Sequence, residues 1–267
     1  MASDVPAVSA AVRILERLAA EWPTAVSPGR LVTELGLNRS TCYNILATLQ
    51  RSGWAASMGE RAGWTLGPRL LTLTGVSHGL VATVVQDEID ALSRELGFVV
   101  FAVEQDGSGG YTVIAKADRQ SGVRVTVGVG DRFPFSAPAL MQAFHAWRDP
   151  DEFDRMVRRR GVQRFTDSTV TDPDELRSVL EKVRQNGYSR SVQQFDLAQG
   201  AAAAAIFDAS ARPSLVVCTL AFSSELHSEN VREVGSLLRT AAERVTRRIG
   251  GAFPPGYPKA ELTESMA

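Results

Sequence analysis

The chain has few of the residues that build a disulfide framework or a metal centre. It contains two cysteines, Cys42 and Cys218, and three histidines among 267 residues, and none of these five lies at a spacing typical of zinc ligands. The cysteines fall in different expected domains, so no disulfide is expected, and a reducing compartment, the cytoplasm, fits this usage. We expect neither a metal nor a cofactor.

Long apolar runs and a strong charge of one sign are also missing. No apolar run approaches the roughly 18 residues of a membrane-spanning helix, and the N-terminus lacks the basic-then-apolar pattern of an export signal. The net charge of −1 divides into +2 for residues 1–70, with seven arginines against five acids, and −3 for the remainder. This weak asymmetry is compatible with DNA binding without demonstrating it.

The common signatures of catalysis are missing too. The sequence has no nucleophile elbow, no phosphate-binding glycine loop and no HExxH. Glu104 and Asp106 are interpreted as a solvated acidic pair, and Cys218 as a core residue in an apolar run. An enzyme with a catalytic C-terminal domain is the alternative from another class. A DNA-bridging protein without a ligand is a third reading, which an enclosed C-terminal pocket would disfavour.

Residues 27–54 predict a helix-turn-helix. Ser27 and Pro28 suit a helix start, because a serine can cap the first turn and proline at the first helical position loses no hydrogen bond. Gly36 supplies the turn, and Asn38 is suited to cap the second helix. The outward side of that helix carries short polar side chains, which suit phosphates and base edges in a major groove. The expected DNA contacts are Ser27, Arg39, Ser40, Thr41, Tyr43, Asn44 and Arg61.

Two short strands, at 54–57 and 64–66, are expected after the second helix, and Arg61 lies at the tip of the loop between them. A hairpin in this position is a wing, so we predict a winged helix over residues 1–73; an ordinary hairpin packed on two helices is the alternative. The first helix is expected to face inward with Val8, Val12, Leu15 and Leu18. A linker helix over 74–97 follows, with an apolar stripe for a core or a second subunit. This stripe consists of Leu80, Val84, Ile89, Leu92 and Leu96.

Short β-rich runs begin at residue 98 and predict an α+β domain with an antiparallel sheet over 98–250. Strands are expected at 98–105, 111–117, 122–130, 187–195, 201–207 and 215–222, and helices at 137–147, 149–160, 172–186 and 228–249. The basic run between Arg155 and Arg164 is interpreted as a solvated face, with a second nucleic-acid patch as the alternative. The proline-containing segment 251–267 is expected to be a disordered tail.

The chain resembles the IclR family of bacterial transcription regulators from about Val8 to Ile249. The resemblance rests on runs of residues in a fixed order. In the first domain these are Leu35–Thr41, Leu46–Leu49, Gly53–Trp54 and Leu66–Leu70; in the second they are Val127–Gly128, Asp131–Pro134, Ala137, Thr171–Pro173, Arg184–Tyr188 and Ala204–Asp208.

The resemblance implies a winged helix, a linker helix and a GAF-like C-terminal domain that binds a small effector. It also implies a homodimer through the DNA-binding domains, often paired into a tetramer. The expected function is therefore a DNA-binding transcription regulator, a repressor, whose operator affinity is controlled by the effector. The resemblance also implies which positions line the effector pocket: Ser191, Ala201, Cys218 and Leu220. Family members that sense small acids carry an Asp, a Cys and two Ser at these positions.

These positions hold smaller or more apolar groups than the family's acid sensors do. Phe133, Leu140 and Met141 are expected to add apolar wall, and Ser191 and Gln194 to make the polar contacts. A buried carboxylate without matched donors is costly, so a bulky and weakly polar effector is predicted. The alternative is a pocket that has filled and binds nothing.

Overall fold

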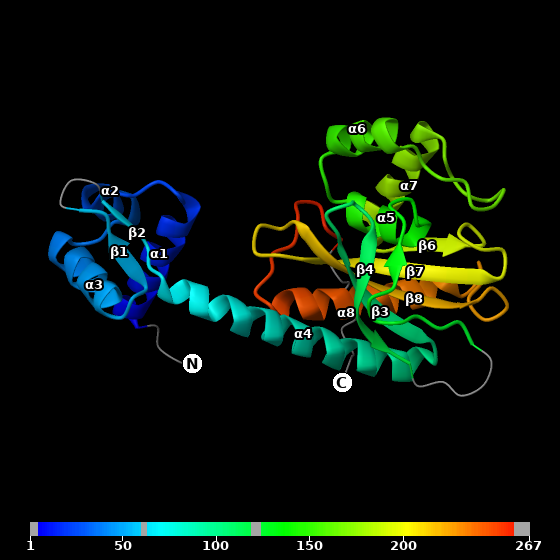
Figure 1. The fold of residues 1–267 in the computed structure, drawn as a ribbon, viewed down its shortest axis with the longest axis horizontal. Helices are drawn as coiled ribbons and strands as arrows, with labels where there is room; N and C mark the ends of the chain where they lie inside the picture. Colours follow the sequence, from blue (N-terminus) through cyan, green and yellow to red (C-terminus); the bar gives the residue numbers. More distant parts are fainter. Residues whose placement is uncertain (1–4, 60–62, 119–123, 259–267) are drawn as a thin grey trace, which may run out of the picture. The chain divides into compact units, whose positions relative to one another are not determined.

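The structure is a computed structural model that describes residues 5–59, 63–118 and 124–258, and side chains of 71–79 are not described. The chain forms two compact units, residues 1–79 and 80–267. Its elements are shown in Figure 1. The first unit contains α1 (Pro6–Ala20), α2 (Pro28–Leu35), α3 (Arg39–Arg51), β1 (Ala55–Ser57) and β2 (Trp64–Leu66), and α4 (Arg69–Leu96) runs through the boundary of the two units.

The helix-turn-helix forms where the caps predict it. The Ser27 Oγ accepts the backbone N–H of Arg30 at 3.3 Å, and Gly36 adopts a left-handed conformation with φ of 63°. Asn38 occupies the N-cap position of α3, but its side chain makes no capping hydrogen bond. The order of helices followed by the β1–β2 hairpin is that of a winged helix.

The inner face of α1 differs from the predicted one. Ala10, Ile14 and Leu18 are buried against the core of the first unit, whereas Val8 and Val12 are 59% and 47% exposed. Both sets recur at helical spacing, so periodicity alone cannot choose between them. Packing against Leu31 and Leu46 selects the Ile14 face.

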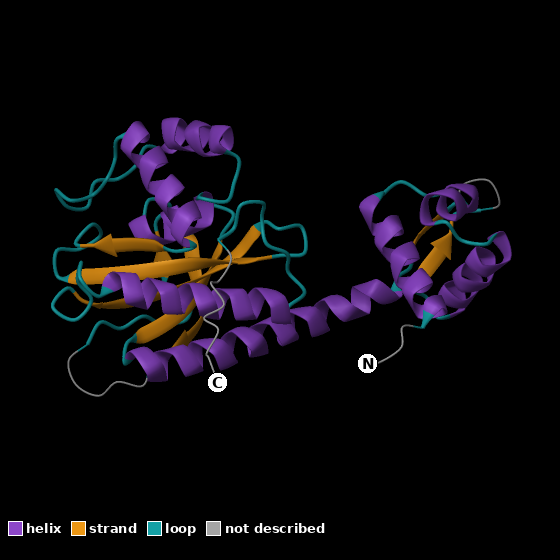
Figure 2. Cartoon of the chain, turned by 180° about the vertical axis from the view of Figure 1, so that it is seen from behind, coloured by secondary structure: helices purple, strands orange, loops and turns teal. Residues whose placement is uncertain are grey.

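The second unit is built on one six-stranded antiparallel sheet with the order β5-β4-β3-β8-β7-β6. Helices α4 and α8 lie along one face of the sheet, and α5 covers the other, with α6 and α7 stacked beyond it (Figure 2). The strands are β3 (Val99–Gln105), β4 (Tyr111–Ala117), β5 (Arg132–Phe133), β6 (Ser189–Val192), β7 (Gln199–Phe207) and β8 (Pro213–Phe222). The helices are α5 (Pro138–His145), α6 (Pro150–Arg160), α7 (Pro173–Asn186) and α8 (Val231–Arg248).

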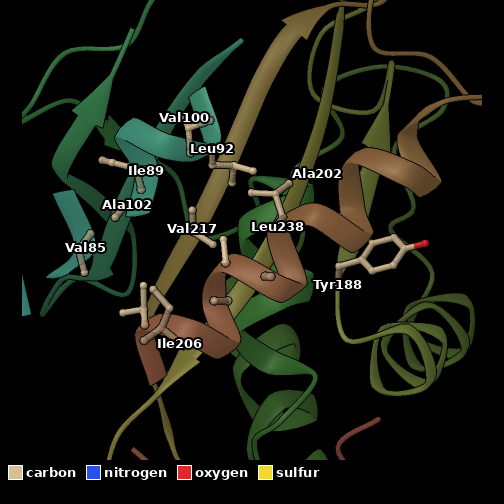
Figure 3. Packing of buried hydrophobic residues seen from close by; sticks show 14 of the residues in the cluster. Val85, Ile89, Leu92, Val100, Ala102, Tyr188, Ala202, Ile206, Val217 and Leu238 are labelled. Carbon is tan, nitrogen blue, oxygen red and sulfur yellow. The ribbon is translucent and has the colours of Figure 1, made fainter. Parts of the chain in front are cut away.

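The alanine run of β7 is explained by helices on both faces of the sheet. Side chains alternate between faces along a strand, so Ala202 and Ala204 join the core beneath α8, and Ala201 and Ala203 join the core beneath α5. Figure 3 shows the α8 side of this packing, where Val217 of β8 meets Leu238 and the linker-helix residues Ile89 and Leu92.

The predicted linker stripe is therefore covered by its own domain. Val84, Ile89 and Leu92 are at most 4% exposed and pack on the sheet, while Leu80 is 55% exposed. Ion pairs hold α4 to α8: the Arg244 Nε donates to Glu88 at 2.6 Å, and Arg248 pairs with Asp87 at 3.2 Å. The stripe consequently offers little apolar surface to a second subunit.

Two further expectations are corrected. Residues 124–130 form no strand; Gly130 has φ of 92°, and the Gly128 N–H donates to Asp131 at 2.7 Å, so the segment turns into the two-residue β5. Residues 251–258 of the expected disordered tail are packed: Phe253 and Tyr257 lie in an aromatic cluster with Phe207. Burial of these apolar rings holds the segment in place.

Candidate functional site

The exposed face of α3 carries the predicted DNA contacts. Cys42 and Leu46 are fully buried on its inner side, which turns the polar side chains of the N-terminal half outward. Arg39, Ser40, Thr41, Tyr43 and Asn44 are all exposed. The Arg39 guanidinium lies 5.9 Å from the centre of the Tyr43 ring. This face is the candidate nucleic-acid interface.

The hydrogen-bonding groups on this face are available for a ligand. Within the described part of the chain, the side chains of Ser40, Thr41 and Asn44 have no hydrogen-bond partner. An asparagine amide can both donate to and accept from adenine, and the hydroxyls suit phosphate oxygens. Ser27 is also exposed, but its Oγ already serves as the cap of α2.

Arginines in the first unit are not equally free to contact phosphates. Arg17 and Arg30 form an ion-pair network with Glu21 and Glu34, at 2.5 to 3.2 Å. The network raises the pKa of both guanidinium groups, chiefly through hydrogen bonds to Glu34. Two of the seven positive charges counted in the sequence are therefore neutralised locally.

Arg39 and Arg51 form no ion pair with a described residue, so no carboxylate neutralises either guanidinium group there. Arg61, the predicted wing contact, lies outside the described residues. The two strands of the wing are antiparallel, with Ala55 opposite Leu66 and Ser57 opposite Trp64. Trp64 also exchanges two backbone hydrogen bonds with Val26, which precedes α2. The sequence pattern did not indicate this third, bridging segment.

A small cavity lies between α5 and the sheet, with a volume of about 20 Å³. Six of the eight predicted effector-binding residues line it: Phe133, Leu140, Ser191, Ala201, Cys218 and Leu220. The lining also includes five residues that are not among the predicted ones: Phe101, Ala137, Pro138, Ala139 and Phe195. Phe101 lies in the lining because alternate side chains of β3 face α5, whereas Phe195 reaches the cavity from the loop after β6.

Aromatic rings form the wall of this cavity. Phe101 and Phe133 stack with ring centres 5.6 Å apart, and Phe195 meets Phe133 edge-on at 6.1 Å. The Ser191 Oγ is the one side-chain oxygen among the lining residues, is buried, and has no hydrogen-bond partner in the described structure. A volume of this size holds roughly one water molecule. A larger ligand therefore needs the aromatic rings to move.

Met141 and Gln194 do not line the cavity. Met141 is 1% exposed and packs with Phe153 of α6 and Leu176 of α7, because successive residues of α5 point in different directions. Gln194 lies beyond the end of β6, where its Oε1 accepts from the Gln142 amide at 3.4 Å. Neither side chain is placed to touch a molecule in the cavity as it stands.

The candidate catalytic groups have structural roles. Burial raises the pKa of the Cys218 thiol, so it is not a thiolate nucleophile. Asp106 accepts hydrogen bonds from Ser108 and Arg132, which lower its pKa to about 2 and fix the β3–β4 turn. Within the described ranges, no group of residues is arranged to hold a metal ion, and no helix is long and apolar enough to cross a membrane.

Comparisons with known proteins point to one family. The chain matches "IclR helix-turn-helix domain" over residues 7–57 and "Bacterial transcriptional regulator IclR C-terminal" over residues 74–247. It is 26% identical to the transcriptional repressor IclR of Escherichia coli over 93% of this chain and 91% of that protein. It is also 26% identical to the regulator KdgR of the same organism, over 82% of this chain and 85% of that one. The crystal structure of a regulator from Alicyclobacillus acidocaldarius superposes with a TM-score of 0.60 and 26% identity, covering 93% of this chain and all of that one.

Proposed function

Because the chain belongs to the IclR family of bacterial transcription regulators, we propose that it represses transcription from an operator that it binds as a homodimer. As a family member it is a DNA-binding regulator and not an enzyme. The observation that carries the proposal is the exposed row on α3, whose polar groups have no partner within the described chain. Asn44 and Tyr43 read base edges, and Arg39, Ser40 and Thr41 contact phosphates.

Support for the homodimer comes from α1. Val8, Val12 and Leu15 follow the three- and four-residue spacing of a coiled-coil seam, and Val5 at the N-cap position precedes them; the three valines are 47–59% exposed. An apolar stripe of this kind on a small domain is suited to a second copy of the same helix. Two copies present two α3 helices, which a pseudo-palindromic operator requires.

The small cavity under α5 is the proposed effector site. Ser191 supplies its polar contact, and Phe101, Phe133 and Phe195 supply an apolar wall. The ligand favoured by this wall is bulky and weakly polar. Since the cavity of about 20 Å³ is too small for such a molecule, the effector binds a conformation in which the rings have parted, and its preference for that conformation is what changes DNA affinity.

The test is a mobility-shift titration of the full chain on DNA from upstream of its own coding sequence. A specific regulator retards this fragment at concentrations that leave a shuffled fragment of equal length free, and the difference persists in physiological salt. Equal retardation of both fragments would contradict operator recognition. Adding a panel of aromatic and acyl metabolites to the same assay identifies compounds that release or tighten the complex.

A further inference from the structure

A second and much larger hollow lies at the open edge of the sheet. It has a volume of about 410 Å³ and is bounded by the edge strand β6, the C-terminal half of α7 and the start of α8. Figure 3 shows Tyr188, one of its lining residues, at the margin of the core, with its hydroxyl pointing away from the other labelled side chains. We call this hollow the edge pocket.

The edge pocket is positively charged. Its charged lining residues are Lys182, Arg190 and Arg232, and none of the three pairs with a carboxylate among the described residues. Nine other arginines of this unit do form such pairs. They are Arg124, Arg132, Arg148, Arg177, Arg184, Arg239, Arg244, Arg247 and Arg248. Arginines on the exposed side of α6, such as Arg158 and Arg159, also lack an ion pair with a described residue, so the distinguishing feature of the hollow is that three such cations line it and no described acidic residue does. A lining of this kind favours negative charge.

Two neighbouring features extend the polar character of the edge pocket. Arg190 and Gln194 also line an adjoining hollow of about 260 Å³, beside Ser228 and Val231, so the polar surface extends past the pocket. Helix α8 begins at Val231, and the positive end of its dipole therefore lies at this wall.

A buried amide faces the edge pocket from α5. Gln142 is 1% exposed, its Nε2 donates to the Gln194 Oε1 at 3.4 Å, and its own Oε1 accepts no hydrogen bond from the described residues. A buried acceptor without a partner is costly unless a ligand or water satisfies it. A hydroxyl group on a bound molecule would do so.

We propose that the edge pocket binds a small hydroxylated organic anion carrying at least two negative charges, as phosphate or carboxylate. Arg190 and Arg232 bind its anionic groups with their planar guanidinium forks, Lys182 adds a third charge, and Gln142 accepts from its hydroxyl. The site is separate from the cavity under α5. Along β6, Ser191 faces that cavity and the exposed Arg190 faces the opposite way.

The two sites share a wall, which gives the second one a route to regulation. Pro138, Ala139 and Leu140 of α5 line the small cavity, and Gln142 of the same helix lines the edge pocket. An anion that fixes Gln142 thereby favours one position of α5. Coupling of this kind is reciprocal: the anion changes effector affinity by the same factor as the effector changes anion affinity.

Calorimetry on the full chain tests the proposal with citrate, tricarballylate, glucose 6-phosphate and inorganic phosphate. Tricarballylate is citrate without its hydroxyl group. We expect citrate or glucose 6-phosphate to bind once per chain, more weakly as salt is raised, and tricarballylate to bind more weakly than citrate. Binding of citrate alone identifies carboxylate as the anionic group, and binding of glucose 6-phosphate alone identifies phosphate. Equal affinities for citrate and tricarballylate would overturn the role of Gln142.

The test variant carries both Arg190→Gln and Arg232→Gln. The control variant carries Arg159→Gln, which lies on α6 and does not line the edge pocket. All three arginines are exposed, so the fold tolerates each change. The double variant should lose roughly tenfold or more in affinity for each charge removed, and the control should bind as the unaltered chain does. No binding of either organic anion, or equal binding by the double variant, would overturn the proposed site.

Discussion

Asn44 is the residue whose position on α3 tests base reading most directly. Its exposed amide has no partner within the described chain, and asparagine pairs with adenine through two hydrogen bonds. Asn44→Ala should cost about 1–3 kcal/mol at one base pair and relax the preference there. Fluorescence anisotropy on operators altered one base pair at a time measures this.

The control for Asn44→Ala is Gln50→Ala, which removes an exposed amide from the far end of the same helix. It should leave the base preference unchanged. If Asn44→Ala alters neither affinity nor preference, a different part of α3 enters the groove.

Arg39 is the residue at which the proposed phosphate contact can be tested apart from base reading. It has no carboxylate partner in the described structure and lies at the first turn of α3. Arg39→Ala should weaken binding to every sequence alike and reduce the slope of log affinity against log salt by about 1. A titration series in salt on specific and shuffled DNA separates the two effects. A loss confined to the specific fragment would show that Arg39 reads bases instead.

His145 is buried without a hydrogen-bond partner for either ring nitrogen in the described structure. Phe135, Phe144 and Phe153 surround it at 5.3–5.4 Å, and burial lowers its pKa to about 3. An imidazole in the unfolded chain has a pKa near 6.5, so the unfolded state takes up the proton first as pH falls. Stability contributed by the neutral ring is complete above about pH 6.5 and is lost progressively between there and pH 3.

His145→Leu removes this titration while keeping the site apolar. Between pH 7 and pH 5 the variant should lose about 2 kcal/mol less of its free energy of unfolding than the unaltered chain. Urea unfolding at the two pH values measures the difference. Identical losses in both proteins would mean that His145 is protonated in the folded state.

Helix α1 is the element on which assembly depends in our proposal. Val12→Lys places a charge in the stripe formed by Val5, Val8, Val12 and Leu15, and should shift a dimer toward monomer and weaken binding to an operator with two half-sites. Ala20→Lys is the matched control, because Ala20 is exposed on α1 away from that stripe. Light scattering at micromolar concentration reports the mass of each. A monomeric unaltered chain would refute the dimer.

Effector binding depends, in our proposal, on the cavity between α5 and the sheet. Ser191→Ala removes a hydroxyl that makes no hydrogen bond within the described chain, so the free energy of unfolding should stay the same or rise. Affinity for an effector that bonds this hydroxyl should fall by about 1 kcal/mol. Calorimetry with aromatic and acyl metabolites, and with short acids for comparison, measures it. Tight binding of glyoxylate or pyruvate with no response to larger compounds would refute a bulky effector.

At the scale of the whole molecule, local chemistry in the sequence predicted most elements. Ser27, Pro28 and Gly36 act through backbone preferences within a few residues, so the helix-turn-helix could be placed before any tertiary contact was known. The helix expected at 228–249 forms as α8, and its residues at three- and four-residue spacing, Val231, Val234, Leu238, Ala241 and Val245, are all buried. The two-domain order and the family resemblance followed from such signals.

Tertiary packing decided what these local signals leave open. The Ile14 face of α1 is buried instead of the Val8 face, the apolar residues of α4 pack on the sheet of their own unit, and Met141 packs against α6 and α7 instead of lining the cavity. Each outcome depends on contacts with residues distant in sequence, which local patterns do not contain. Tertiary packing also paired Arg17 and Arg30 with acids and left Arg190 and Arg232 unpaired. The sequence gives the number of charges and the apolar face of each helix. Which carboxylate a given arginine pairs with, and which surface a given apolar face packs against, depend on the tertiary structure.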